Sequence, residues 1–200
     1  MPRVSSKDKY TVQVFELFKR CGLSLNMEVI AQELGLTKKT LYNNFTCKAE
    51  LINTVVEYFY SILEKEINNA INNSDNAIEA MFNVSTVVTK EISALGQIFL
   101  KDISQYHASP GIFAFTDRVN FYSKFIMKNL QRGIDEGLFR TDINMDYATI
   151  FYNSAIELFY RWDNGFKYFP NAAHYHRELV KHHLYAVINE KGRGVLETYM

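Results

Sequence analysis

A short polar stretch in the first quarter of the chain carries the side chains best suited to contact a nucleic acid. They are cations, amides, a hydroxyl and a phenol, at Lys38, Lys39, Thr40, Tyr42, Asn43 and Asn44. Cations and hydroxyls suit phosphate oxygens, whereas an asparagine amide can form two hydrogen bonds with an adenine edge. A polar face that meets only solvent is the other interpretation, so the elements that hold these residues must decide between the two.

The apolar residues around this stretch predict a pair of short helices. Residues 27–34 have apolar side chains at helical spacing, and Gly35 is the residue type that ends a helix in the left-handed conformation. Thr37 can cap a second helix over 38–45, in which Leu41 faces inward. Two helices joined by a tight glycine turn are a helix-turn-helix. An αα-hairpin with a solvated polar face remains the alternative.

The rest of the chain also has helical patterns. Ser5 or Ser6 can cap a helix to about Cys21 that buries the inner face of the pair, which makes a three-helix head. A helix from Thr46 or Cys47 to about Asn73 is longer than usual. Further helices are expected over about 77–95, 96–106, a long stretch ending at 137, 145–162 and 172–189, with a Pro-Gly break at 107–111, a turn at 163–165 and a frayed tail after 192.

Composition and charge narrow the class of protein. The chain has 200 residues, of which 48% are hydrophobic, so it can bury a sizeable core. The net charge is zero, but residues 1–48 hold eight cations and four anions and therefore carry +4, which leaves −4 on the remainder. The basic part coincides with the candidate helix-turn-helix, as binding to a polyanion requires.

The cysteines and the hydropathy of the chain indicate the cellular compartment of the protein. Cys21 and Cys47 have neither a metal-ligand spacing nor the pattern of a disulfide framework, which fits a reduced compartment. The polar start of the chain shows no signal peptide, and no apolar run approaches the roughly 18 residues that span a bilayer. We expect a cytoplasmic protein without membrane contact.

Several residues together match a known pattern in register. They are Leu17-Phe18, Gly22, Ile30-Ala31, Gly35-Leu36-Thr37, Leu41-Tyr42, Phe45, Lys48 and Leu51. This part of the chain resembles the N-terminal signature of the TetR-type (TetR/AcrR-like) transcriptional regulators, and residues 133–140 resemble a phrase common in their C-terminal domains. The resemblance implies an all-α homodimer with a DNA-binding head at residues 1–50, joined by a long helix to a helical ligand-binding and dimerisation domain at 51–200.

The resemblance also implies roles for single residues. Thr37, Tyr42 and Lys48 match positions that usually touch phosphates, and the best candidates for base edges are Lys38, Lys39, Thr40 and Asn43, with Asn44 suited to either. A partly buried ring that holds the turn together is the alternative for Tyr42. Lys39, Asn44 and Cys47 depart from the usual residues of the family, so an operator sequence cannot be carried over from relatives.

Aromatic residues make up 14% of the chain and suggest a ligand pocket in its second part. The candidate lining residues are Phe99, Tyr106, His107, Phe121, Phe125, Tyr152 and Trp162. Core packing is the alternative for each ring. His107 lies at the expected break, where a helix end beside a cavity can move when a ligand enters, so His107→Ala would then change ligand affinity and inducer response.

The last two long helices have a separate role under the resemblance, which implies that they pack against the same pair of a second subunit. The residues expected at that interface are Ile150, Ser154, Leu158, Leu179, His183, Ala186 and Val187. Two heads about one DNA turn (~34 Å) apart would then read a palindrome.

Metal binding and catalysis find little support in the sequence. His174, His176, His182 and His183 lie close in sequence, but neither a cysteine nor a paired carboxylate joins them at a metal-ligand spacing. We therefore expect no metal and no cofactor, and surface or interface histidines instead. The sequence contains no nucleophile elbow and no phosphate-cradling glycine loop, which argues against an enzyme.

The sequence thus favours a ligand-responsive DNA-binding regulator. The expected form is a repressor that binds a palindromic operator as a homodimer and is released by a small, largely apolar or aromatic effector. Two alternatives remain: a helical enzyme that uses the aromatic pocket, and a helical adaptor or small-molecule-binding protein that no longer reads DNA.

Overall fold

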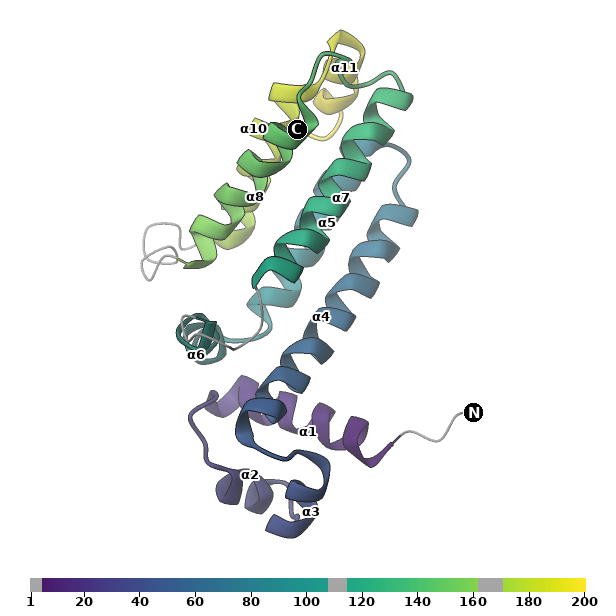
Figure 1. The fold of residues 1–200 in the computed structure, drawn as a ribbon. Coiled ribbons are helices and arrows are strands. Elements are labelled where there is room, and N and C mark those ends of the chain that lie inside the picture. Colours follow the sequence, from purple (N-terminus) through teal and green to yellow (C-terminus); the bar gives the residue numbers. More distant parts are fainter. Residues whose placement is uncertain (1–4, 108–114, 162–170) are drawn as a thin grey trace. The chain divides into compact units, whose positions relative to one another are not determined.

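The computed structural model describes residues 5–107, 115–161 and 171–200, with side chains described except at 97, 104–121, 157–161 and 172. Over these residues the chain is helical, with one isolated antiparallel bridge between Phe139 and Ile188 (Figure 1). The helices are α1 (Ser6–Cys21), α2 (Met27–Glu33), α3 (Lys38–Asn44), α4 (Lys48–Asn72), α5 (Ala77–Ser93), α6 (Gln97–His107), α7 (Phe115–Asp135), α8 (Met145–Arg161), α10 (Ala172–Val187) and α11 (Glu190–Glu197). The all-α prediction is confirmed.

The chain forms two compact units. Unit 1 comprises Met1–Lys65 and Glu91–Phe113, and unit 2 comprises Glu66–Lys90 and Ala114–Met200. The head and α6 therefore belong to unit 1, and α7 to α11 belong to unit 2, whereas α4 and α5 contribute residues to both. The boundary expected after residue 50 separates a DNA-binding part from a ligand-binding part. The two compact units do not test this functional boundary, so it stays a prediction.

Unit 1 is organised around the inner face of α1. A capping box starts this helix, because the Ser5 hydroxyl accepts from the Asp8 N–H at 3.0 Å and the Asp8 carboxylate accepts from the Ser5 N–H at 3.3 Å. Phe18 is fully buried, and Phe15 lies edge-on to Phe99 of α6 with ring centroids 6.1 Å apart. The predicted start of α1 at Ser5 or Ser6 is confirmed.

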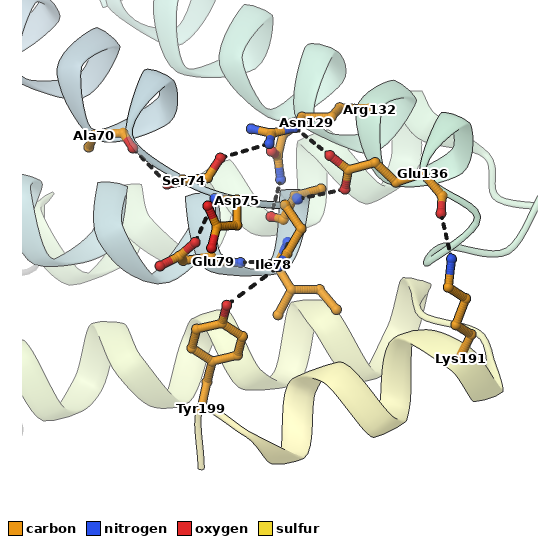
Figure 2. Close-up of polar contacts among 12 residues, drawn as sticks. Ala70, Ser74, Asp75, Ile78, Glu79, Asn129, Arg132, Glu136, Lys191 and Tyr199 are labelled. Carbon is orange, nitrogen blue, oxygen red and sulfur yellow. Dashed lines mark hydrogen bonds and ion pairs between the residues drawn. The ribbon is translucent and has the colours of Figure 1, made fainter.

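In unit 2, α8 packs against both α7 and α10, and polar side chains fix the turn between α4 and α5 (Figures 1 and 2). Arg132 of α7 donates to the Ser74 carbonyl at 2.8 Å and to the Glu136 carboxylate at 2.6 Å. The other Glu136 oxygen accepts from the Ala77 N–H at 2.8 Å, and Asn129 donates to the Ala77 carbonyl at 2.9 Å. The Glu136 carboxylate thus accepts a hydrogen bond from one of the backbone N–H groups that lack an intrahelical partner at the start of α5.

The C-terminal tail is helical, which corrects the prediction that it frays after Gly192. Asn189 caps α11 by accepting from the Gly192 N–H at 2.9 Å, and Leu196 is fully buried. Lys191 donates to the Glu136 carbonyl at 3.0 Å (Figure 2). The prediction failed because it used only closeness to the end of the chain, whereas the cap and a contact 55 residues away hold the tail.

Most of the expected break at 107–111 and the whole expected turn at 163–165 lie outside the described residues. Over the part of the chain that the structure does describe, no helix is long and apolar enough to cross a bilayer.

Candidate nucleic-acid interface and ligand cavity

Caps and one glycine hold α2 and α3 as a helix pair. The Asn26 side chain accepts from the Val29 N–H at 2.9 Å and caps α2. Gly35 has a φ of 64°, in the left-handed region that favours glycine, and it lets the chain turn directly after α2. The Thr37 hydroxyl accepts from the Thr40 N–H at 3.0 Å and caps α3. The predicted helix-turn-helix is therefore present.

α3 buries one face and exposes the other. Leu41 and Phe45 have no exposed surface and anchor the helix in unit 1. The remaining residues point outward to different degrees: Lys38, Lys39, Tyr42 and Asn43 are exposed, and Thr40 and Asn44 are half-buried. The outward placement of the first four is confirmed, whereas their contact with DNA stays a prediction.

Lys39 and Asn43 are the most available side chains on this face. They are four residues apart, so they lie one above the other along the helix. Among the described residues, neither side chain has a hydrogen-bond or ion-pair partner within the protein. They can therefore approach a DNA base edge without breaking an internal contact.

A second column of side chains on α3 is already paired. The Lys38 ammonium donates to the Glu28 carboxylate of α2 and lies 6.0 Å from the centroid of the Tyr42 ring. This hydrogen bond raises the pKa of Lys38 and lowers that of Glu28. Tyr42 is 41% exposed, so its ring remains accessible to a partner. Sequence reasoning missed Glu28, because a pairing ten residues away leaves no local pattern.

The other two polar residues of α3 also serve to hold the helix. The Asn44 amide donates to the Thr40 carbonyl at 2.8 Å, and the Thr37 and Thr40 hydroxyls lie 2.8 Å apart. Contact with a phosphate through these groups would compete with bonds that cap or extend α3.

A carboxylate organises the turn into α4. Glu50 accepts from the Thr46 N–H, the Thr46 hydroxyl and the Lys7 ammonium, each at 2.7 Å, and these bonds lower its pKa to about 2, with the Lys7 bond the largest cause. Cys47 replaces the usual oxygen cap, since its Sγ lies 3.5 Å from the Glu50 backbone nitrogen.

Lys48, the first residue of α4, is half-buried. Burial lowers the pKa of its ammonium group, and the nearby Asp102 carboxylate partly opposes that shift.

Asp102 of α6 fixes the segment that follows α1. Its carboxylate accepts from the Leu23 N–H at 2.6 Å. Gly22 ends α1 with a φ of 76°, and a Cβ there would lie 2.5 Å from an Asp102 oxygen and 2.6 Å from the Ile98 side chain. Only glycine therefore lets α6 approach the end of α1 this closely.

Asp102→Ala should destabilise unit 1 by about 1–3 kcal/mol, because the Leu23 N–H would lose a charged acceptor at a part-buried site. Urea denaturation would measure the loss, and hydrogen exchange of the Leu23 amide should accelerate. Asp102→Asn keeps an acceptor oxygen and should cost less. An unchanged exchange rate for the Leu23 amide in Asp102→Ala would contradict this role.

Unit 2 contains a small, partly open cavity of roughly 10 Å³, enough for about one water molecule. Its lining comes from α5, α7, α8 and α10 and consists of Val84, Ser85, Val88, Tyr122, Phe125, Tyr152, Ile156 and His176. No lysine, arginine, aspartate or glutamate is among these residues.

The predicted ligand-binding residues are only partly brought together. Phe125 and Tyr152 line this cavity, whereas Phe99 is fully buried in unit 1 against Phe15. Trp162 and the side chains of Tyr106, His107 and Phe121 lie outside the described residues. Ser85 and His176 were missed, because a helical sequence pattern does not reveal which buried polar residues face a cavity.

Hydrogen bonding determines which ring nitrogen of His176 carries the proton. The Thr89 hydroxyl donates to the Ser85 carbonyl at 2.8 Å and lies 3.1 Å from His176 Nδ1. Because its single proton is already donated, the hydroxyl must accept from Nδ1–H, and Nε2 is then the acceptor nitrogen of the ring. Burial lowers the pKa of His176 to about 4 and raises that of Tyr152. Both side chains are therefore neutral at pH 7.

The four clustered histidines do not share one surface. His176 and His183 are buried, whereas His174 and His182 are exposed. Within the described residues, no group of three or more His, Cys, Asp and Glu is placed to hold a metal ion. His183 and Val187 are buried inside unit 2, which corrects the expectation that both face a second subunit. The Tyr152 ring lies tilted against the His183 ring, with centroids 4.8 Å apart.

Acidification should destabilise the protein between pH 6.5 and pH 4. Burial lowers the pKa of both His176 and His183 to about 4, whereas an unfolded histidine titrates near 6.5. The unfolded state therefore binds more protons in this window, so stability falls with falling pH, by up to about 3 kcal/mol per histidine. Thermal melts across this range should show a shallower pH dependence for His183→Gln than for the exposed control His182→Gln. Equal slopes would contradict the assignment.

Solved structures share this fold. KstR2, a ketosteroid transcriptional regulator of Mycobacterium tuberculosis, matches with a TM-score of 0.61 over 94% of this chain and 98% of its own, at 22% identity. The TetR family transcriptional regulator PfmR of Thermus thermophilus matches with a TM-score of 0.63 over 87% of this chain and 98% of its own, at 20% identity. The chain therefore has the fold of these helix-turn-helix regulators.

Curated relatives are of the same class. YvaF of Bacillus subtilis, an uncharacterized HTH-type transcriptional regulator, is 31% identical over 97 residues, which are 48% of this chain and 50% of YvaF, so the match spans about half of that relative. The HTH-type transcriptional repressor KstR2 is 24% identical over 150 residues, 73% of this chain and 75% of KstR2. No protein-family model matches the chain.

The chain therefore has the fold of TetR family regulators and is similar in sequence to HTH-type transcriptional regulators, in agreement with the resemblance seen in the sequence. These relatives are regulators and not enzymes.

Proposed function

We propose that this protein is a repressor that binds a palindromic DNA operator as a homodimer and is released by a small, neutral, largely apolar effector. The observation that carries the proposal is the face of α3 in a basic head, where Lys39 and Asn43 are exposed and, among the described residues, without an internal partner. A cation and an amide at this spacing suit the major groove. The repressor KstR2 is a relative with the same fold.

An exposed apolar patch on α8 supports the homodimer. Tyr147, Ile150 and Phe151 are 61%, 56% and 72% exposed, and the Tyr147 and Phe151 rings stack with centroids 6.3 Å apart. Three large apolar side chains on one helix face are costly to leave in water and mark a protein interface. A second copy would cover this patch with its own α8 and α10 around a two-fold axis. Ile150 and Ser154 remain expected interface residues, and Tyr147 and Phe151 join them.

The cavity in unit 2 supports an uncharged effector. Its described lining residues are apolar apart from the hydroxyl groups and the neutral His176 ring, so burying a charged ligand against them would cost several kcal/mol. At roughly 10 Å³ the cavity is too small for a ligand, which must therefore separate the helices that line it. KstR2 is described as a ketosteroid regulator, and a ketosteroid is an apolar molecule with polar ends.

Release would follow from differential affinity for two conformations. The ligand favours a state in which the heads are wrongly spaced, through a tilt of α4, whose residues belong to both units. The shift cannot exceed the preference of the ligand between the two states, typically about 1–3 kcal/mol of coupling.

A gel-shift titration against the DNA upstream of the protein's own gene tests the proposal. The protein should bind this duplex in preference to random competitor, and log affinity should fall steeply with log salt as several counterions are released. Equal binding to both duplexes at all salt concentrations would instead indicate an adaptor that no longer reads DNA.

A further inference from the structure

One acidic side chain, that of Glu28, lies beside the polar side chains of α3 that would contact DNA. Glu28 of α2 forms an ion pair with Lys38 of α3, and their side chains are 59% and 57% exposed. A carboxylate repels phosphate oxygens. It would therefore lower the affinity of a surface whose only role is to neutralise the charge of the DNA backbone. A carboxylate can, however, accept a hydrogen bond from a base edge.

We infer that Glu28 and Lys38 act together as one reader of a G·C base pair in each half of the operator. This specificity-determining role rests on the proposed function. In the major groove, guanine presents the acceptors O6 and N7, and the paired cytosine presents the N4 amino group as a donor. The Lys38 ammonium suits the guanine acceptors, and the Glu28 carboxylate suits the cytosine donor.

Other base pairs fit this reader less well. An adenine offers the ammonium one acceptor beside a donor, and the O4 atom of its thymine partner would repel the Glu28 carboxylate. A reversed C·G pair exchanges the positions of donor and acceptors. The two side chains should therefore select one base pair in one orientation, both by attraction and by repulsion.

Contacts within the protein hold this reader in place before DNA arrives. Lys38 is bonded to Glu28 and lies 6.0 Å from the centroid of the Tyr42 ring. A lysine that is already ordered loses less rotamer freedom on binding than one that moves freely. Lys39 has no such contact among the described residues, so of the two cations only Lys38 is held in place before binding.

Binding-site selection from a random duplex library tests the inference with the full chain. The variants are Glu28→Ala, Lys38→Ala, the double variant and the control Glu33→Ala. Glu33 is exposed on the same helix and, over the described residues, forms no ion pair. Its removal therefore deletes the same charge without touching the pair. Because all three side chains are exposed, thermal melts should show that the variants remain folded.

The wild-type protein should select one G·C pair in a fixed orientation in each half-site, by about 5- to 150-fold over the other base pairs. Glu28→Ala and Lys38→Ala should each lose the preference at that position and keep it elsewhere, and the double variant should lose no more. Glu33→Ala should keep the whole pattern. If Glu28→Ala only strengthened binding to all sequences equally, as expected for Glu33→Ala, the inference would be overturned. A wild-type protein without any sequence preference would overturn the proposed function as well.

Discussion

Asn43→Ala should reduce affinity for the selected operator by about 2–6 kcal/mol per dimer, or roughly 30-fold to 3 × 10⁴-fold, and leave non-specific affinity nearly unchanged. The side chain is exposed and, among the described residues, has no internal partner, so its loss leaves the fold intact. A bidentate pair between Asn43 and an adenine is worth about 1–3 kcal/mol, and a homodimer makes it twice. Fluorescence anisotropy with specific and random duplexes would measure both affinities.

Two further variants separate base reading from phosphate contact. Lys48→Ala should weaken binding to all sequences alike and reduce the salt slope by about 2 per dimer, because one phosphate contact is lost in each subunit. Gln32→Ala removes an exposed amide from the neighbouring helix and should change neither affinity. If Asn43→Ala behaved like Lys48→Ala, Asn43 would contact phosphates rather than bases.

Gly192→Ala should destabilise the protein by about 1–3 kcal/mol or more. A Cβ at this position of α11 would lie 2.2 Å from the Leu138 carbonyl oxygen and 3.0 Å from the Ile188 Cβ. The first of these atoms is backbone and cannot rotate away, so α11 would have to shift from its place. Urea denaturation should show the loss as a lower midpoint.

Gly194→Ala provides the matched control on the same helix. A Cβ there meets no atom within 4 Å, and alanine favours a helix over glycine by up to about 1 kcal/mol, so this variant should be slightly more stable than the wild type. The two variants should therefore differ by about 2–4 kcal/mol. Equal effects would mean that α11 does not pack against residues 138 and 188 in solution.

The head could be predicted closely because its signals are local. A cap at Thr37, a glycine at Gly35 and apolar residues at helical spacing determine where α2 and α3 begin, turn and end. The same local pattern identifies which side of α3 is buried, since Leu41 must face inward.

Contacts between distant parts of the chain could not be predicted. The Glu28–Lys38 pair joins two helices, the tail is held by a contact to Glu136, and His176 reaches the cavity through a bond to Thr89, 87 residues away. None of these follows from periodicity, because each depends on how helices pack rather than on where they form. A single sequence therefore predicted the exposed face of α3 better than the lining of the cavity.

Two copies of α3 should occupy successive major grooves of one operator. Methylation protection at guanine N7, an atom of the major groove, tests it directly on the bound duplex. Two protected clusters, about 10 base pairs apart and related by a two-fold axis, are the expected result. A single cluster, or protection confined to adenine N3 in the minor groove, would contradict this arrangement.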